Sequence, residues 1–486
     1  MNNKYILAID AGTTGVRTVL YDKKSTEIAI KYDEFTQITP EPSLLEHDPL
    51  EIWNLTKDLV IKVVKEAGIQ FIDIAALGLA TQRSTAVAWD KNTGIPVHNA
   101  IVWQDLRTNE RSMELSELFG REISPLATYT KYEWLLDNVP NCRERVENGD
   151  VLMGTMDSWL IWKLTNGKSF ITDPANAVSS FLWNPMSGEW MPETASIIQF
   201  PVERLAQLVS SSEVYGVTDK DLFDVEIPIA ALTGDQQAAM YGHLATERGE
   251  GKASYGTSVM VDVNTGTDWI ETENSFPLAL WRLNGEDTFC LEGQVVTAGA
   301  SINWAKEMNI FEDIKEVSME DNLPEAGGVY FVPALQGLGA PYMDTSIKGG
   351  IIGLTRATKR QHVVKAILEA IAFRTKQVVE LLRDQVDEDA FPTLQVDGGM
   401  STNDYFMQLQ ADILGINVER HSTEQVTSLG IAYLAGLAVG YWEDEAEIKK
   451  LKKRGTVFIP NNDNTEIQER FEKWKKIIDA VRGIET

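Results

Sequence analysis

Asp10 stands where a carboxylate can take part in chemistry on phosphate. It follows the apolar residues 6–9 and opens the turn Asp-Ala-Gly-Thr-Thr, between two stretches that read as β-strands over residues 6–21. Gly12 and Gly15 permit left-handed or closely approached backbone, the N–H groups of the turn can form a nest for an anion, and Thr13 and Thr14 add hydroxyl donors. A carboxylate beside phosphate suits Mg²⁺. The pattern favours a phosphate and metal site, although an ordinary hairpin capped by Gly and Thr would have the same residues.

A second carboxylate, Asp235, follows an apolar stretch and Gly234, and it precedes a sequence typical of a helix. Proteins of the α/β class place reactive groups at such strand ends. The alternative interpretation is that Asp235 only caps the N-terminus of the helix.

A second turn resembling the first lies in residues 253–263, about half a chain length later. Two turns of this kind indicate a duplicated fold, and 486 residues exceed the size of one typical core. The polar, glycine-rich residues 246–251 are the best candidate for a boundary. We therefore expect two domains, residues 1–246 and 247–486.

Two further clusters could bind a ligand. Asp397-Gly-Gly399 comes at a turn from strand to helix, where backbone can approach phosphate or a planar group at the positive end of the helix. Trp103 could pack against the carbon skeleton of a small polar substrate, or it could be an ordinary core residue. Neither pattern is specific by itself.

The elements that must position these residues alternate between strand and helix, which indicates an α/β fold. Helices are expected from residue 48 onward, over residues 362–383 and at the C-terminal end, where Ile467, Phe471, Trp474, Ile478 and Val481 form one stripe before Gly483. Strands are expected at residues 74–80, 86–89 and 394–396.

Composition and charge exclude some classes of partner. Hydrophobic residues make up 43% and charged residues 24% of the chain, as in packed domains, and the net charge is -28. Such an acidic chain is not expected to bind nucleic acid or an anionic membrane. We expect no signal peptide and no membrane span. Cys142 and Cys290 have no metal-ligand spacing, and a cytoplasmic location is the simplest interpretation.

Taken together, these segments resemble the FGGY family of carbohydrate kinases, most closely its glycerol kinase branch, over essentially the whole chain. Residues 349–369 also fit the second signature of the family. The other matching segments include Asp-Ala-Gly-Thr-Thr at 10–14, Glu-His-Asp-Pro at 46–49, Gln-Arg at 82–83, Ala-Ile-Val-Trp-Gln at 100–104, Gly-Asp-Gln-Gln at 234–237, Ala-Gly-Ala-Ser-Ile at 298–302, Gly-Leu-Gly-Ala-Pro-Tyr at 337–342 and Asp-Gly-Gly at 397–399.

The resemblance implies two ribonuclease H-like domains of the actin and hexokinase type around an ATP cleft. It implies that Asp235 is the general base and that Asp10 and Asp235 flank Mg²⁺. The nucleotide and its phosphates would be bound by Gly12, Thr13, Thr14, Arg17, Thr257, Gly299, Asn303, Gly399 and Asn403. The substrate would be bound by Arg83, Ser84, Trp103, Leu126, Asp235, Gln236 and Met260.

The expected reaction is ATP-dependent phosphorylation of a hydroxyl of a small polyol or sugar, of the type that converts glycerol to glycerol 3-phosphate. The pocket departs from the glycerol kinase pattern at Ser84, Leu126 and Met260, where glutamate, tyrosine and an aromatic residue are expected. An alternative substrate is therefore another polyol or ketose, of the erythritol, xylulose, ribulose or gluconate type. An actin-like ATPase or a non-enzymatic protein is a weaker alternative. The family pattern also suggests a homo-oligomer, dimer or tetramer.

Overall fold

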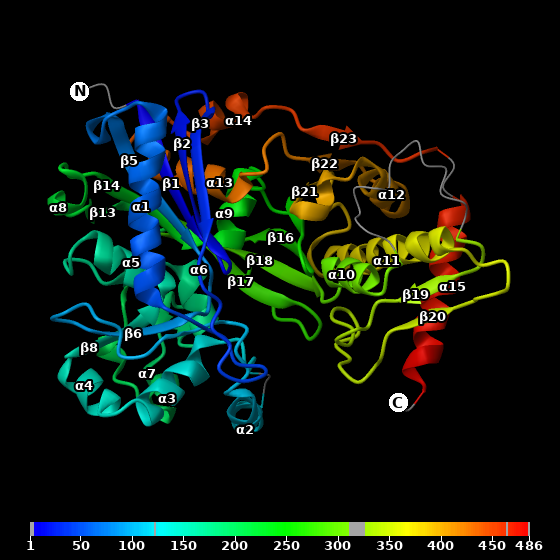
Figure 1. Ribbon diagram of the computed structural model, residues 1–486, viewed down its shortest axis with the longest axis horizontal. Helices are drawn as coiled ribbons and strands as arrows, with labels where there is room; N and C mark the ends of the chain where they lie inside the picture. The colour runs from blue at the N-terminus through cyan, green and yellow to red at the C-terminus, as the bar shows by residue number, and fades with distance from the viewer. Residues whose placement is uncertain (1–3, 121–122, 311–325, 463–464, 485–486) are drawn as a thin grey trace. The chain divides into compact units, whose positions relative to one another are not determined.

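The computed structural model describes residues 4–120, 123–310, 326–462 and 465–484, which fold into two compact units (Figure 1). Unit 1 comprises Met1–Leu244, Leu278–Thr288 and Gln425–Lys452. Unit 2 comprises Ala245–Pro277, Phe289–Glu424 and Lys453–Thr486. The chain first crosses near the expected boundary at 246/247, but two later segments return to unit 1, which a contiguous division does not anticipate.

The main sheet of unit 1 begins with the expected hairpin. Its strand order is β13-β14-β5-β1-β2-β3. Strands β1, β5 and β14 are parallel, whereas β2, β3 and β13 run antiparallel to their neighbours. The bounds are Tyr5–Ala11 for β1, Gly15–Asp22 for β2, Glu27–Glu34 for β3, Ile74–Thr81 for β5, Ser212–Val217 for β13 and Pro228–Gly234 for β14.

Helices cover both faces of this sheet. Helix α1 (Pro49–Ala67), capped by Asp48, packs on β2 and β3 and shares a core with Leu7 and Leu77. Helix α13 (Val426–Ala438) packs on β1, β5 and β14, and a Cβ at Gly78 would lie 2.6 Å from the Ile431 carbonyl oxygen. Because alternate strand residues face opposite sides, Leu77 and Gly78 place the two helices on opposite faces.

Helix α9 (Asp235–Gly242) follows β14 directly and lies against α13. The two helices approach closely because both carry glycine at the contact. A Cβ at Gly430 would lie 1.8 Å from the Ala238 carbonyl oxygen, and one at Gly242 would lie 2.2 Å from that of Val426. Helix α13, far along the chain, therefore fixes the helix that carries Asp235.

A second sheet in unit 1 has the order β4-β7-β6-β8, with bounds Glu46–His47, Ala100–Ile101, Ala86–Asp90 and Val151–Thr155. Beside it in the chain lie α2 (Asn109–Phe119), α3 (Thr128–Asn138), α4 (Cys142–Asn148) and α5 (Met156–Leu164). Trp89 packs edge-on against Trp159 of α5, with ring centroids 5.2 Å apart. This layer anchors the segment that carries Trp103.

Unit 2 contains strands β16, β15, β21, β22 and β23 of a sheet whose full order is β17-β18-β16-β15-β21-β22-β23, whereas residues 278–288, which cover most of β17 and the start of β18, are part of unit 1. The bounds are Phe276–Leu283 for β17, Glu286–Val295 for β18, Val259–Gly266 for β16, Gly251–Tyr255 for β15, Leu394–Asp397 for β21, Val418–Arg420 for β22 and Thr456–Phe458 for β23. Its helices are α10 (Gly299–Glu307), α11 (Arg360–Val386), α12 (Asp404–Leu414) and α15 (Thr465–Arg482).

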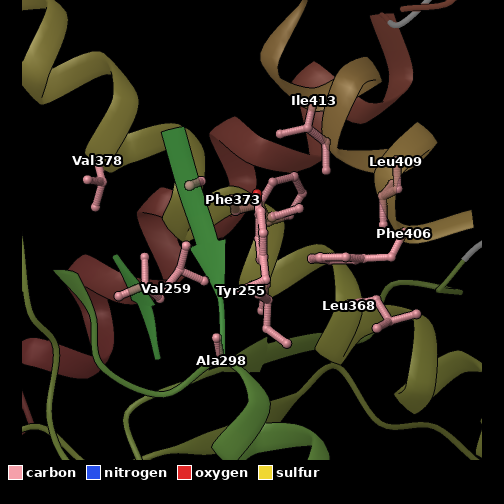
Figure 2. Packing of buried hydrophobic residues seen from close by; sticks show 14 of the residues in the cluster. Tyr255, Val259, Ala298, Leu368, Phe373, Val378, Phe406, Leu409 and Ile413 are labelled. Carbon is pink, nitrogen blue, oxygen red and sulfur yellow. The ribbon is translucent and has the colours of Figure 1, made fainter. Parts of the chain in front are cut away.

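Figure 2 shows the core of unit 2 around Tyr255. The Tyr255 ring meets Phe406 edge-on, with centroids 5.5 Å apart, and its hydroxyl donates to Gln410 Oε1 at 2.8 Å. The strand that carries the second turn is thereby held by α12, the helix that follows the double glycine.

The expected helices and strands are confirmed, with α1, α11 and α15 a few residues longer or shorter than predicted. No helix in the described ranges is both long and apolar enough to cross a membrane. The remaining short elements are β9 (Ile171–Thr172), α6 (Pro174–Ala177), β10 (Trp183–Asn184), β11 (Glu189–Trp190), α7 (Pro192–Ile197), β12 (Gln207–Leu208), α8 (Lys220–Phe223), β19 (Tyr330–Val332), β20 (Gly350–Ile352) and α14 (Glu445–Leu451).

Candidate active site

Three parallel strands of unit 1 end at the same level. Ala11 of β1 pairs with Thr81 of β5, and Thr81 pairs with Gly234 of β14. The chain leaves these strands through the first turn, through residues 82–85 and through Asp235. Parallel strand ends of this kind are where α/β proteins bind ligands.

Asp10 lies one residue before this level and is nearly buried, with 9% of its surface exposed. Burial raises the pKa of Asp10 to about 6, Arg17 opposes this rise, and the negative charge of Asp235 adds to it. The Arg17 guanidinium donates to Asp10 Oδ2 at 3.4 Å. Two carboxylates that repel each other in a partly buried site are stabilised by a cation.

The donor set fits Mg²⁺. This ion is typically held by one or two carboxylates, with water and substrate phosphate completing its shell. Within the described part of the chain, no group of three or more His, Cys, Asp and Glu side chains is placed to hold a metal ion. Asp10 and Asp235 can therefore supply the protein's share of a magnesium site, but not a complete cage.

Asp235 is the first residue of α9, and Gly234 is the N-cap. The side chain of Asp235 accepts a hydrogen bond from the backbone N–H of Gln236 at 2.8 Å. The alternative in which Asp235 serves as the N-cap is therefore wrong. Asp235 and Gln236 are both half-buried, so the carboxylate keeps an open side.

Arg83 lies over the same strand end. A Cβ at Gly234 would come within 2.7 Å of Arg83 Cδ and 2.4 Å of Gln237 Oε1, so only glycine leaves room for the arginine stem. The next residue, Ser84, has a φ of 61°, which is uncommon for a residue with a side chain. The turn after β5 thus brings Arg83 close to Asp235.

The first turn and Trp103 are in direct contact. Trp103 Nε1 donates to Thr13 Oγ1 at 2.9 Å, and the tryptophan is half-buried rather than part of the core. Gly15 is needed because a Cβ there would lie 2.5 Å from the Asp33 carbonyl oxygen. Neither Gly12 nor Gly15 has a positive φ, so close approach and not left-handed backbone explains the glycine at position 15. Thr14 is exposed at the tip of the turn.

Leu126 lies in the loop before α3. The buried Lys131 ammonium holds this loop by donating to the carbonyl oxygens of Pro125, Leu126 and Ala127, at 2.9, 2.9 and 3.2 Å. Burial lowers the pKa of Lys131 to about 7, and the carboxylate of Asp105 opposes this shift. Leu126 is half-buried.

In unit 2 backbone hydrogen bonds join the second turn to the start of α10. The carbonyl oxygens of Gly256 and Thr257 accept from the N–H groups of Gly299 and Ala300 at 3.1 and 3.0 Å, at the start of α10. A Cβ at Gly299 would lie 2.4 Å from the Gly256 carbonyl oxygen. Thr257 is exposed, and Asn303 lies exposed one turn further along α10.

The double glycine meets the same turn. Gly398 has a φ of 85°, and a Cβ on it would lie 2.5 Å from the Tyr255 carbonyl oxygen. Gly399 beside it is exposed. The structure gives Asn403 a structural role, because its side chain caps α12 and accepts from Phe406 N at 2.8 Å. Met260 is half-buried on β16 in unit 2, whereas the other expected substrate residues belong to unit 1.

Sequence reasoning assigned no role to several polar residues that support the first turn, Gln37, His47, Gln82 and Thr85, nor to Lys131. His47 and Gln82 lay within segments that match the family, which is the one signal that could have pointed to them. Their contacts depend on pairings between distant segments.

Family models describe the chain in two parts. Residues 5–242 match the N-terminal domain of the FGGY family of carbohydrate kinases, and residues 251–439 match its C-terminal domain. The chain belongs to this family. It is therefore an ATP-dependent kinase that phosphorylates an alcohol group of a small polyol or sugar.

Members of the FGGY family resemble the chain along its full length. It is 43% identical to glycerol kinase 2 of Thermotoga maritima, with 99% of each chain covered. It is 41% identical to glycerol kinase of Alkaliphilus metalliredigens, with 98% of each covered. The solved structure of Plasmodium falciparum glycerol kinase with ADP matches with a TM-score of 0.91 and 29% identity over 99% of each chain. The expected fold, two domains of the actin and hexokinase type, is confirmed.

Proposed function

We propose that the protein phosphorylates a terminal hydroxyl of glycerol with ATP. The observation that carries this proposal is the cluster at the strand ends of unit 1, where Asp10, Arg83 and Asp235 lie close together. Beside this cluster is the first turn, whose Thr13 accepts a hydrogen bond from Trp103. The full-length similarity to glycerol kinases supports glycerol as the substrate.

In the proposed mechanism Asp235 is the general base. Its carboxylate takes the proton from the substrate hydroxyl while that oxygen forms a bond to the γ-phosphorus of ATP and the bond from phosphorus to the β,γ-bridging oxygen breaks, releasing ADP. Phosphoryl transfer depends on positioning and charge stabilisation more than on covalent help from the protein.

Other side chains of unit 1 position the reactants. Arg83 would donate to substrate hydroxyls, and the face of Trp103 would pack against the carbon skeleton, with Ser84, Leu126 and Gln236 nearby in the pocket. Thr13, Thr14 and Arg17, with the backbone at Gly12, would donate to the phosphates. Mg²⁺ held by Asp10 and Asp235 would supply charge neutralisation on the phosphates.

We assign the nucleotide to the C-terminal domain and the substrate and phosphates to the N-terminal domain. In unit 2 the exposed Thr257, Asn303 and Gly399 and the half-buried Gly299 lie on three segments that contact one another at the second turn. Asn403 contributes by fixing α12, and we assign Met260 to substrate binding. Cys142 and Cys290 are both buried and outside any disulfide, which supports a cytoplasmic location, and we expect a homo-oligomer, dimer or tetramer.

A second candidate substrate is a longer polyol or ketose. Ser84, Leu126 and Met260 are each smaller or less polar than the residues expected in a glycerol pocket. A buried hydroxyl left without its partner costs about 1 to 3 kcal/mol, enough to lower affinity tenfold or more. The vacated volume would suit a substrate with more carbons.

The test is release of ADP with ATP and Mg²⁺ across glycerol, dihydroxyacetone, erythritol, threitol, xylulose, ribulose and gluconate. Under the proposal, glycerol gives the highest kcat/KM. A higher kcat/KM for a four- or five-carbon compound would favour the second candidate, and no saturable turnover with any of them would contradict both.

The variant Ser84→Glu sharpens this test. If the missing carboxylate weakens glycerol binding, Ser84→Glu raises kcat/KM for glycerol about tenfold, in line with one restored hydrogen bond to a charged group. The matched substitution Ser84→Gln adds similar volume without the charge. Equal effects of the two variants would show that volume and not hydrogen bonding sets the preference.

A further inference from the structure

A chain of hydrogen bonds runs from the first turn to the substrate tryptophan and continues beyond it. Trp103 Nε1 donates to Thr13 Oγ1 at 2.9 Å, and the backbone N–H of Trp103 donates to Thr85 Oγ1 at 3.3 Å. The Thr85 hydroxyl donates in turn to Gln82 Oε1 at 2.9 Å. Thr85 and Gln82 are buried, so these bonds are shielded from water.

A second series of hydrogen bonds leads from Gln82 back to the first turn. Gln82 Nε2 contacts His47 Nδ1 at 3.5 Å and donates to the Gly12 carbonyl oxygen at 3.2 Å. His47 Nε2 contacts Gln37 Oε1 at 2.9 Å, and Gln37 Nε2 donates to the Thr13 carbonyl oxygen at 3.1 Å. The bonds therefore close a ring that begins and ends at Thr13. We call Thr13, Gln37, His47, Gln82, Thr85 and Trp103 the hydrogen-bonded ring.

The direction of the two His47 contacts follows from which partner atoms can donate. Gln37 donates through its amide nitrogen, so its oxygen accepts from His47 Nε2–H. The Gln82 amide nitrogen can only donate, so His47 Nδ1 accepts from it and carries no proton, which makes the imidazole neutral. Burial lowers the pKa of His47 to about 4, in agreement with a neutral ring member.

This direction has a consequence for Thr13. Its hydroxyl oxygen already accepts from the Trp103 indole, so the hydroxyl proton is left to point elsewhere. The turn is where the phosphates are proposed to bind, and an O–H aimed at phosphate is a donor that an anion can use. Trp103, on the other side of the same bond, faces the proposed substrate.

We propose that the hydrogen-bonded ring couples the phosphate site to the substrate site, with His47 as its positioning residue. Binding of phosphate at the turn orders Thr13 and, through the indole, the face of Trp103. Substrate packing on Trp103 orders the turn in return, as linkage requires for binding free energies. This inference rests on the proposed function, since it takes the two sites from it.

The experiment measures binding, not turnover. The dissociation constant of ADP is determined calorimetrically in the presence of Mg²⁺, with and without saturating glycerol, or the best acceptor from the panel above. For the unaltered protein we expect glycerol to tighten ADP binding about fivefold or more. For His47→Leu, which removes both the donor and the acceptor, we expect the two dissociation constants to agree within about twofold.

Two further variants separate coupling from folding. His47→Gln supplies one donor and one acceptor, and we expect it to restore most of the coupling. His98→Leu is the matched control, because His98 is a partly buried histidine that contacts the Asn99 carbonyl oxygen outside the ring, and its coupling should equal that of the unaltered protein. Should His47→Leu fail to fold, the proposal is tested on His47→Gln and on Trp103→Phe, which removes only the indole donor.

Coupling that persists in His47→Leu or Trp103→Phe would overturn the inference, as would its absence from the unaltered protein. These outcomes differ from failure of the proposed function, in which no acceptor of the panel binds or turns over in the unaltered protein. An equal loss of coupling in His98→Leu would also overturn the inference, because any histidine change would then have the same effect.

Discussion

The main sheets of the two units repeat one pattern with different means of support. In unit 1 the order β3-β2-β1-β5-β14-β13, and in unit 2 the order β18-β16-β15-β21-β22-β23, pair as antiparallel, antiparallel, parallel, parallel and antiparallel. The first turn is supported by side chains, Gln37, Gln82 and Trp103, whereas the second is supported by backbone groups at Gly256, Thr257 and Gly398.

The same comparison locates the chemistry. Asp10 stands one residue before the end of β1, and Ser254 takes that place on β15. Asp235 follows β14, and His421 follows β22. At these two corresponding positions the duplicated sheets therefore differ, with acidic residues in unit 1 and Ser254 and His421 in unit 2, so topology alone does not make a catalytic site.

The largest expected effect comes from removing the base. Asp235→Asn keeps the size of the side chain and should lower kcat by about 10²- to 10⁴-fold with the fold intact. Steady-state ADP release and circular dichroism on the purified protein check this. The control is His421→Asn at the corresponding place of unit 2, which should change kcat by less than about threefold. Near-normal turnover of Asp235→Asn would remove it from the mechanism.

A smaller effect is expected where backbone supports the second turn. Gly398→Ala forces a Cβ to within 2.5 Å of the Tyr255 carbonyl oxygen at a φ of 85°, and it should lower the free energy of unfolding by about 2 to 4 kcal/mol. Denaturant titration measures this loss. Gly399→Ala is the neighbour for comparison, since no atom lies within 4 Å of its Cβ position, and it should cost less than about 1 kcal/mol. Equal losses would contradict the view of a sterically fixed turn.

The smallest effect concerns pH and the ring that supports the first turn. The pKa of His47 is lowered to about 4 in the folded protein from an ordinary 6.5, so the unfolded chain binds more protons between these values. Its contribution to stability is complete above pH 6.5 and is lost as pH falls toward 4. At pH 5 the loss is about 2 kcal/mol.

This loss can be isolated by difference, because other groups titrate in the same range. Unfolding free energies of the unaltered protein and of His47→Gln are compared at pH 7.5 and pH 5. The unaltered protein should lose about 2 kcal/mol more than the variant between the two values. Equal losses of unfolding free energy in the unaltered protein and in His47→Gln would show that His47 is not held neutral.

Much of the fold could be predicted from local sequence. The hairpin around Gly12, the helix that opens at residue 48 and the stripe of α15 depend on residues close in the chain, and they are found as expected. The division of the chain could not be predicted so well, because the return of α13 to unit 1 depends on glycine contacts between distant helices.

Site prediction shows the same limit. Asp10, Arg83, Trp103 and Asp235 were located by motif, and the structure brings them to one end of the sheet. His47 and Gln37 were not identified, because the hydrogen-bonded ring has no local sequence signal and forms only once several strands are in register. Asn403 was expected at the nucleotide, and its helix cap is a role that motif matching does not separate from binding.

Helix α13 finally bears on how the chain is made. Residues 426–438 cover the face of β1, β5 and β14 and hold α9 through Gly430. During synthesis the first sheet emerges long before this helix. The face of β1, β5 and β14 that α13 covers therefore stays exposed until nearly nine-tenths of the chain has been translated. A nascent chain halted before residue 425 would therefore be a substrate for chaperones rather than a finished first domain.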